Sequence, residues 1–538
     1  MKINLTQEQK EVVEAVSRER AIKINAYAGT GKTTTLTAIA NTYKNNKILY
    51  VAFNRSVIEE MKKKKLSNVD ARTIHSLALE HTKSDLGLKG GNIADRNHFR
   101  DEIERFFYLT YEQTLVIRDV FTLFCNSKYT EINLKTISSL LEHKKDLQFR
   151  LKITGLSVAT ITEYLQEIFR RILTKEFNVI THDIYMKFFH INLSRYGKEL
   201  ASKYDILLID ESQDVNGTQA GLLAVPFKRK VIVGDTHQNI YNWRDTINIL
   251  SHSKDFKLYN LTTTFRFEND EILKLVNSYL NKVKHDTNTL KSIKTNKSNS
   301  LTAFISRSNA RLLEKLMKAE QKVRILGDKT ELIRQMRQAE SILRYLHTRE
   351  IIGSINPFIK RVIDEREMFD LDELVNILSL EAGEEELARA LLLVERFDVD
   401  EIEHRIKTMH DENAKTILTT AHTSKGLEFD TVVLLNDFTT PSELIKKFLE
   451  YNPHIDPNKI NELIKSDSYL IRELIDELNT LYVAITRAIH SLDFENYSLK
   501  KHLIDLTTET TEINKEQNKT KEIQPLTKED LDKLLGLL

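Results

Sequence analysis

The sequence is poor in cysteine and proline and contains no long apolar run. Cys125 is the only cysteine in 538 residues, which excludes a disulfide framework and favours a reducing compartment. Six prolines occur and none precedes Pro226, so the sequence permits long helices before that point. No apolar stretch approaches the roughly 20 residues of a membrane helix, and the chain starts without the apolar segment of a secretory signal. We therefore expect a cytoplasmic protein without membrane contact, associated with the nucleoid in a bacterium.

An excess of charge of either sign is also missing. The chain carries 79 Lys and Arg against 78 Asp and Glu, which argues against binding a polyanion over its whole surface. Any contact with nucleic acid must therefore be local. The 41% hydrophobic and 29% charged residues are typical of a globular protein. Roughly two to four domains are expected at this length, because one hydrophobic core stops growing well below it.

Short β-branched and apolar runs alternate with helix-compatible stretches. The strand candidates fall at residues 22–26, 48–53, 206–209, 231–233, 301–306, 416–420 and 432–435. This alternation predicts an α/β protein with parallel sheets, and two sheets are the simplest arrangement. Two mostly helical blocks, at 79–180 and 332–408, are expected to be insertions into the α/β cores.

The C-terminal part changes in composition. Residues 507–521 are polar and poor in apolar side chains, which predicts a flexible linker. Residues 526–538 have the pattern of a short amphipathic helix. That helix could dock a protein partner, but a helix of about 12 residues is marginal alone, so packing on the body is the simpler expectation.

The sequence AYAGTGKT at 26–33 has the spacing of a Walker A loop, with alanine at its first position where glycine is usual. Gly29 and Gly31 let backbone amides curl around phosphate oxygens. Lys32 can reach the β and γ phosphates, and Thr33 can offer its hydroxyl to Mg²⁺. A chance glycine-rich turn is disfavoured because strand, loop and helix follow in the required order. The predicted nucleotide-binding residues of this loop are Ala28, Gly29, Thr30, Gly31, Lys32, Thr33 and Thr34.

The run YDILLIDESQD at 204–214 is an apolar strand that ends in carboxylates. Beside a phosphate loop, Asp210 would hold Mg²⁺ directly or through water, and Glu211 would accept the proton of the attacking water. This is the chemistry of ATP hydrolysis. Asp214 taken alone is equally well interpreted as a solvated acidic cap.

With VGDTHQNIYNWR at 233–244, these segments resemble motifs II and III of superfamily 1A DNA helicases, the UvrD, PcrA and Rep group. The likeness extends along the chain through LTQEQKEVVEA (5–15, Q motif), FNRSVIEEM (53–61, Ia), RTIHSLA (72–78, Ib), TTTFRF (262–267, IV), TTAHTSKGLEFDTVVLL (419–435, V) and DELNTLYVAITRA (476–488, VI). The forms NAYAGTGKTTTL, THDIYMKFF and ELNTLYVAITRA are most similar to the F-box DNA helicase branch.

The resemblance implies roles around ATP and Mg²⁺. Arg266 and Arg487 match the two arginines that close on the γ-phosphate, which suits a planar guanidinium. The other positions carried over are Gln9 for reading adenine, Phe265 for stacking on adenine, Gln238 for sensing the γ-phosphate and Glu428 near the ribose. Motif IV departs from the family pattern, with FRF in place of the commoner YRS, and this bears most on the stacking role of Phe265.

The resemblance also implies a path for single-stranded DNA. Aromatic side chains can stack on unpaired bases without reading sequence, each base contributing roughly 1–3 kcal/mol. Trp243, the only tryptophan, is favoured for this role, whereas core packing is an equal alternative for Phe53 and Tyr241. The predicted DNA-binding residues are Phe53, Asn54, Thr73, His75, Tyr241, Trp243, Arg244 and His422.

The resemblance implies two RecA-like P-loop domains with parallel sheets, each carrying a mostly helical insertion. The expected boundaries are 1–78 and 181–265 for the first RecA-like domain, 79–180 for its insertion, 266–331 and 409–500 for the second RecA-like domain, 332–408 for its insertion and 501–538 for the linker and short C-terminal helix. The implied activity is an ATP-dependent helicase or translocase moving 3′ to 5′ on single-stranded DNA, in repair, recombination or replication. The expected partners are single strands and junctions with duplex, bound by a monomer or weak oligomer.

Three alternatives differ in activity. A nuclease-helicase is disfavoured, because little sequence follows motif VI. A nucleotide-dependent switch that lost unwinding stays open, because the second insertion is compact. A motor that mainly strips proteins from single strands also stays open.

Overall fold

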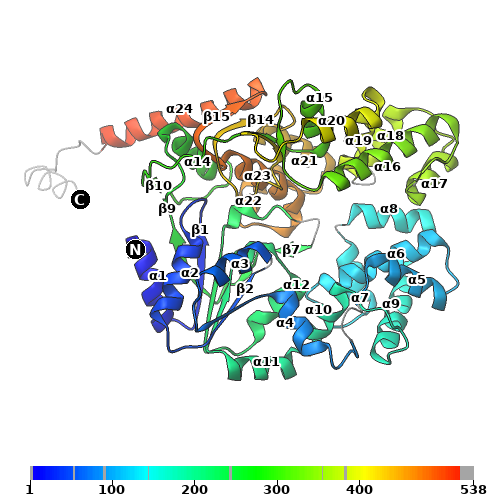
Figure 1. Cartoon of the computed structure of the whole chain (residues 1–538), viewed down its shortest axis with the longest axis horizontal. Coiled ribbons are helices and arrows are strands. Elements are labelled where there is room, and N and C mark those ends of the chain that lie inside the picture. The colour runs from blue at the N-terminus through cyan, green and yellow to red at the C-terminus, as the bar shows by residue number, and fades with distance from the viewer. Residues whose placement is uncertain are drawn as a thin grey trace, which may run out of the picture.

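The structure is a computed structural model that describes residues 4–52, 55–88, 93–142, 144–241, 245–353, 355–380 and 384–520. Two parallel sheets form its centre, and helices surround each of them (Figure 1). The predicted α/β class with two sheets is confirmed. Among the described residues, no helix is both long enough and apolar enough to cross a membrane.

The first sheet has the strand order β3-β2-β4-β6-β1-β8, and its pairings are parallel. Its strands are β1 (Ala21–Ala26), β2 (Ile48–Ala52), β3 (Val69–Thr73), β4 (Ile206–Ile209), β6 (Arg229–Gly234) and β8 (Lys257–Leu261). Strands β2 and β4 are buried along their whole length, as expected of apolar strands covered on both faces. Because the strands are parallel, the loops after β1, β4 and β6 meet at one edge.

The helices around this sheet are α1 (Gln7–Arg18), α2 (Lys32–Thr42), α3 (Arg55–Lys63), α4 (Ile74–Thr82), α10 (His182–Ile191), α11 (Leu193–Lys203), α12 (Gly217–Ala220) and α13 (Ile249–His252). Short elements at its carboxyl edge are η1 (Ser212–Asp214), β5 (Val215–Asn216), η2 (Gly221–Ala224), η3 (Thr236–Gln238) and β7 (Thr246–Ile247).

The second sheet has the order β12-β13-β11-β14-β15 and is also parallel. Its strands are β11 (Thr302–Ser306), β12 (Arg324–Ile325), β13 (Thr416–Thr420), β14 (Phe429–Leu434) and β15 (Ala488–Phe494), and the short pair β9 (Thr263–Thr264) and β10 (Lys291–Ser292) lies beside it. The helices and 3₁₀ turns here are α14 (Asp270–Lys282), α15 (Asn309–Met317), α21 (Pro441–Tyr451), η5 (Pro457–Lys459), α22 (Ile460–Lys465), η6 (Tyr469–Ile471), α23 (Arg472–Ile485) and α24 (Tyr497–Thr520).

Two helical blocks lie to one side of the sheets (Figure 1). The first contains α5 (Arg96–Phe106), α6 (Tyr111–Asn126), α7 (Leu134–Leu141), α8 (Lys145–Thr154) and α9 (Val158–Leu173), and the second contains α16 (Lys329–Thr348), α17 (Pro357–Glu365), α18 (Leu371–Leu380), α19 (Glu385–Arg396) and α20 (Val399–Met409). The blocks contact each other where Arg150 pairs with Glu384 at 3.3 Å and lies 5.2 Å from the ring centroid of Phe358. The exact domain boundaries stay a prediction.

The C-terminal segment differs from expectation. Helix α24 continues to Thr520, through most of the segment 507–521 for which a flexible linker was predicted. The segment contains no proline or glycine, the residues that most strongly interrupt a helix, so its polar composition alone did not exclude one. The helix predicted at 526–538 lies outside the described residues.

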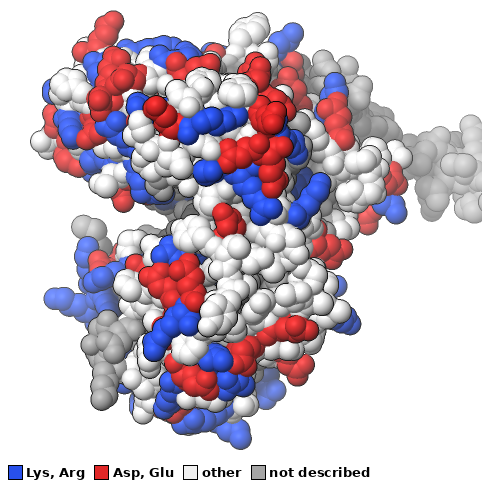
Figure 2. Space-filling view, turned by 90° about the vertical axis from the view of Figure 1, so that its right-hand side faces the viewer, with Lys and Arg blue, Asp and Glu red and all other residues white. Residues whose placement is uncertain are grey.

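Charges on the surface are mixed, as the balanced composition suggested. Figure 2 shows basic and acidic side chains interspersed over one face, with a hollow between an upper and a lower lobe. A single basic face does not dominate this view.

Candidate nucleotide site and strand path

The phosphate loop connects β1 to α2 and packs closely against the second half of the chain. Gly29 and Gly31 have φ of 75° and 81°, a conformation that favours glycine. A Cβ on Gly29 would lie 2.5 Å from Cβ of Arg266, so no side chain fits there. The main-chain oxygen of Gly29 accepts a hydrogen bond from the amide of Phe265 at 2.9 Å. The loop therefore contacts motif IV directly.

Other loop residues are held by their neighbours. The oxygen of Ala28 accepts from Thr264 Oγ1 at 2.8 Å, and the buried Thr30 hydroxyl donates to the oxygen of Tyr27 at 2.8 Å. Thr33 and Thr34 lie half-buried in the first turn of α2. The positive end of this helix consequently faces the loop, which suits phosphate.

Helix α1 brings the Q motif to the same loop. Gln9 forms a capping box with Thr6, and its Nε2 donates to the oxygen of Thr30 at 3.3 Å. Gln9 is 2% exposed, so its amide is committed to the site rather than to solvent. The carboxylate of Glu8 accepts from the amides of Thr262 and Thr263, each at 3.0 Å. Glu8 was missed from sequence because it ties α1 to a segment more than 250 positions away.

The carboxylate pair lies at the end of β4. Lys32 Nζ donates to Glu211 Oε1 at 2.8 Å, and Tyr50 donates to Asp210 Oδ2 at 2.5 Å. Burial and the neighbouring Glu211 carboxylate raise the pKa of Asp210. Burial acts to raise the pKa of Glu211 too, but the Lys32 ammonium outweighs it and the pKa is lowered. Glu211 has φ of 49°, a strained conformation for a residue other than glycine and a frequent mark of functional sites.

Two arginines from the second half converge on this site. Arg266 pairs with Glu428 at 3.3 Å and donates to the oxygen of Thr486 at 2.9 Å. Arg487 is 1% exposed and donates to the oxygens of Val483 and Leu427. Burial and the nearby Arg266 guanidinium lower the pKa of Arg487 to about 9.

Among the described residues, no carboxylate lies within ion-pair distance of Arg487. A buried cation without a counter-charge is costly, and an anion bound beside it would offset that cost. The site therefore fits the phosphates of a nucleotide.

Magnesium also fits the donor set. Thr33 and Asp210 offer a hydroxyl and a carboxylate, the oxygen ligands that Mg²⁺ prefers. Among the described residues, no group of three His, Cys, Asp or Glu side chains is placed to hold a metal, so phosphate and water oxygens would complete the coordination shell.

Motif III joins the two halves of the molecule. Gln238 Nε2 donates to Asp235 Oδ2 at 2.7 Å, and Asp235 also accepts from Tyr482 of α23 at 3.4 Å. Asn479, one turn earlier on α23, donates to the oxygen of Asn239 at 2.9 Å. The predicted γ-phosphate sensor thus lies against the helix that leads to Arg487.

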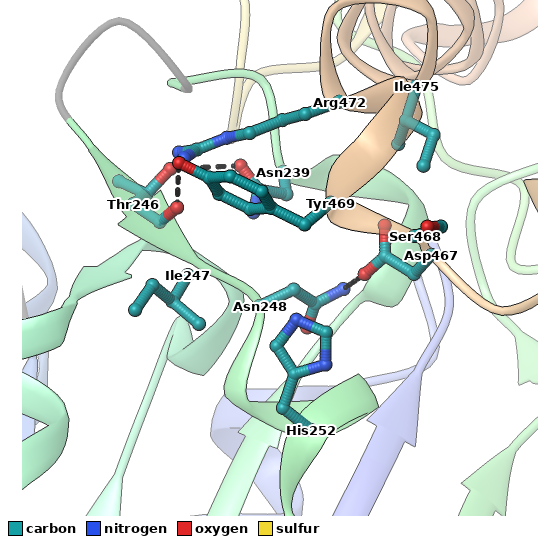
Figure 3. Close-up of a pocket in the computed structure, with 10 residues that line it drawn as sticks. All are labelled: Asn239, Thr246, Ile247, Asn248, His252, Asp467, Ser468, Tyr469, Arg472 and Ile475. Carbon is teal, nitrogen blue, oxygen red and sulfur yellow. Dashed lines mark hydrogen bonds between the residues drawn. The ribbon is translucent and has the colours of Figure 1, made fainter. Parts of the chain in front are cut away.

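A small cleft continues this interface (Figure 3). Asn248 donates to Asp467 at 2.8 Å across it, and Arg472 donates to the oxygen of Thr246. Its lining residues are Asn239, Thr246, Ile247, Asn248, His252, Asp467, Ser468, Tyr469, Arg472 and Ile475. These bonds attach the segment that follows motif III to the start of α23.

Part of the predicted strand path also lies between the halves. The Tyr241 hydroxyl donates to the oxygen of His422 at 3.4 Å, and their ring centroids are 6.2 Å apart. His75 contacts Tyr185 at 3.3 Å, and Thr73 caps α4 by accepting from the amide of Ser76 at 3.1 Å. Tyr241 and His422 are thus brought together, whereas Thr73 and His75 stand on the first half alone. The predicted contacts Phe53, Asn54, Trp243 and Arg244 lie outside the described residues.

The interpretation of Asp214 as a solvated cap is wrong. Asp214 is 1% exposed and pairs with Lys425 at 2.6 Å, because η1 turns it inward against the second half. Burial, opposed by the Lys425 ammonium, raises the pKa of Asp214 to about 6. Lys425 was missed from sequence, although its place within motif V was a usable signal.

A second buried contact was also missed. Tyr27 of the phosphate loop donates to Asp286, and His237 of motif III lies 2.8 Å from the same carboxylate. Asn288 donates to the Tyr27 hydroxyl at 2.9 Å. The phosphate loop and motif III are therefore both anchored to the segment after α14.

A phosphate loop and a carboxylate pair at the carboxyl edge of a parallel sheet define a P-loop nucleotide-binding protein, here with a second sheet that supplies arginines. Residues 5–257 match the family model of the UvrD/REP helicase N-terminal domain. The chain belongs to the UvrD/PcrA-like helicases of superfamily 1.

Relatives agree with this assignment. F-box DNA helicase 1 of Gallus gallus is 26% identical over 524 residues, covering 90% of this chain and 48% of the relative. F-box DNA helicase protein 1 of Schizosaccharomyces pombe is 29% identical over 536 residues, covering 90% of this chain and 56% of the relative. The ATP-dependent DNA helicase PcrA of Staphylococcus aureus is 28% identical over 313 residues, covering 52% of this chain and 40% of the relative. The chain spans about half the length of the curated relatives it matches.

We predict that Gly29→Ala weakens nucleotide binding at least about tenfold and destabilises the fold by more than about 1 kcal/mol, because the added Cβ is both strained and obstructed. Gly155→Ala is the matched control, since Gly155 has φ of 68° but nothing within 4 Å of its Cβ position. Urea unfolding and nucleotide titration measure the two effects. Equal destabilisation and unchanged binding in both variants would contradict the close packing.

We predict that His422 makes the protein less stable in mild acid. Burial, helped by the Arg307 guanidinium, lowers the pKa of His422 to about 4. Below the ordinary value of about 6.5, the unfolded chain takes up a proton that the folded chain refuses, so stability falls as the pH drops toward 4. His422→Gln should remove about 2 kcal/mol of this loss in urea unfolding between pH 7 and pH 4. The exposed His454→Gln should leave it unchanged, and an equal effect of both variants would count against the assignment.

Proposed function

We propose that this chain is an ATP-driven motor on single-stranded DNA, which unwinds duplex or strips bound proteins. The observation that carries the proposal is the convergence of Arg266 and Arg487 on the Lys32–Glu211 pair from a separate sheet. A site divided between two sheets can close on a triphosphate and open on a diphosphate. The names of the relatives, DNA helicases in each case, support DNA as the substrate.

The chemistry follows from the charges. Lys32 is held by Glu211, and phosphate oxygens would draw the ammonium away from that carboxylate. Glu211, freed from Lys32, accepts the proton of the attacking water. Mg²⁺, held by Thr33 and Asp210, would supply charge neutralisation at the phosphates. Arg266 and Arg487 contact the γ-phosphate and give up these contacts once it leaves.

The motion would reach DNA through the interface between the halves. Tyr241 on the first half contacts His422 on the second, so a change in the distance between the halves changes the space around a stacked base. Phe53, Trp243 and Arg244 would complete the grip. We also propose 3′ to 5′ movement, ribose contact by Glu428, adenine stacking by Phe265, and a role in repair, recombination or replication, all on the strength of the family resemblance.

Two RecA-like domains are proposed within the sequence-derived boundaries, with α5–α9 and α16–α20 as their insertions. Single strands and junctions with duplex are the proposed partners.

The first test is ATP hydrolysis with and without an unstructured oligo-dT strand. We expect strong stimulation by the strand in the wild type, and a kcat lowered at least about 100-fold in Glu211→Gln, because the general base is lost. The exposed Glu11→Gln should behave as the wild type. Hydrolysis that ignores the strand would favour a nucleotide-dependent switch instead.

A second test uses thermal stability. Because Arg487 is buried without a carboxylate, we expect a non-hydrolysable ATP analogue at saturation to raise Tm by at least about 2 °C more than ADP does. Arg487→Met should abolish this difference while keeping the stabilisation by ADP. An undiminished difference in the variant would remove Arg487 from the γ-phosphate site.

A further inference from the structure

A buried ion pair connects the two halves next to the catalytic carboxylates. Lys425 lies in the turn after β13, in the second sheet, and Asp214 closes η1 after β4, in the first. Their side chains are 9% and 1% exposed and the atoms Nζ and Oδ2 are 2.6 Å apart. A pair this deeply buried holds its geometry tightly, because separating it leaves a charge without a partner or water.

The same ammonium contacts both ends of a short segment of motif III. Lys425 Nζ donates to the main-chain oxygen of Gln238 at 2.5 Å and lies 4.7 Å from the ring centroid of Tyr241. Gln238 is the candidate γ-phosphate sensor, and Tyr241 is a candidate stacking residue. One cation therefore lies between a group that faces ATP and a group that faces the strand.

On its other side, the ion pair is continuous with the general base. Gln213 Nε2 donates to Glu211 Oε2 at 2.6 Å and to Asp214 Oδ2 at 3.3 Å. The order Glu211, Gln213, Asp214, Lys425, Tyr241 is thus an unbroken sequence of polar contacts. Each link is made by one side chain, and the only link between sheets in this sequence is the ion pair.

We propose that Lys425, paired with Asp214, is a positioning residue that couples the state of the ATP site to the grip on single-stranded DNA. This inference rests on the proposed function. When the sheets approach or separate, Lys425 moves with the second sheet while Asp214 and Tyr241 belong to the first. The position of the Tyr241 ring therefore depends on how the ATP site is closed.

The test is the affinity for a fluorescent oligo-dT strand, measured by anisotropy with a non-hydrolysable ATP analogue and with ADP. The ratio of the two Kd values measures the coupling between the sites. We expect a ratio of at least about fivefold in the wild type. Lys425→Met should bring the ratio to within about twofold of one, and Lys425→Arg, which keeps the charge, should restore most of it.

Lys425→Met leaves Asp214 buried without its partner and can fail to fold. The double variant Asp214→Asn, Lys425→Met removes both charges and keeps similar volumes, so it should fold and still lose the ratio. The exposed Lys415→Met, a few residues earlier, should keep the wild-type ratio.

Loss of affinity in equal measure with both nucleotides would indicate a structural role and overturn the coupling, as would a wild-type ratio in the folded double variant. A wild type that binds no strand with either nucleotide would overturn the proposed function, and the coupling with it.

Discussion

Buried positive charge controls the interface between the two sheets. Lys32 and Lys425 each meet a carboxylate of the segment after β4, at 2.8 and 2.6 Å. Arg487 meets only main-chain and hydroxyl oxygens among the described residues, and lies near the guanidinium of Arg266. Carbonyl oxygens solvate a cation less well than a carboxylate, so the interface is poised for one more anion. The remaining contacts of the site hold this arrangement of charges in place.

Much of the site could be predicted because its residues follow local patterns. The glycines, Lys32 and Glu211 each stand directly after an apolar strand, and parallel strands carry such residues to the same edge. Strands 206–209 and 416–420 were predicted to the residue, since their apolar runs are bounded by charged or polar positions. Local pattern failed in the C-terminal part, where polar composition predicted a linker and the backbone is helical.

What escaped prediction depends on pairs of residues far apart in the chain. Nothing around Asp214 distinguishes a solvated cap from half of a buried ion pair, because its partner lies 211 positions later. Tyr27 and Asp286 are 259 positions apart, and no periodicity connects them. Such contacts are decided by how the second half docks on the first. The sequence motifs identified which residues are chemical, but not which of them touch.

Helix α23 shows how docking and chemistry are combined in one rigid element. Its first residue, Arg472, contacts Thr246; Asn479 contacts Asn239; and Arg487 follows its last turn. At 1.5 Å per residue, the distance from Arg472 to Arg487 is roughly 22 Å. A helix of this length transmits a displacement of one end to the other without bending much. A shift of Arg487 by a phosphate group is therefore felt along the whole of motif III, while the ion pair of Lys425 and Asp214 acts at its middle.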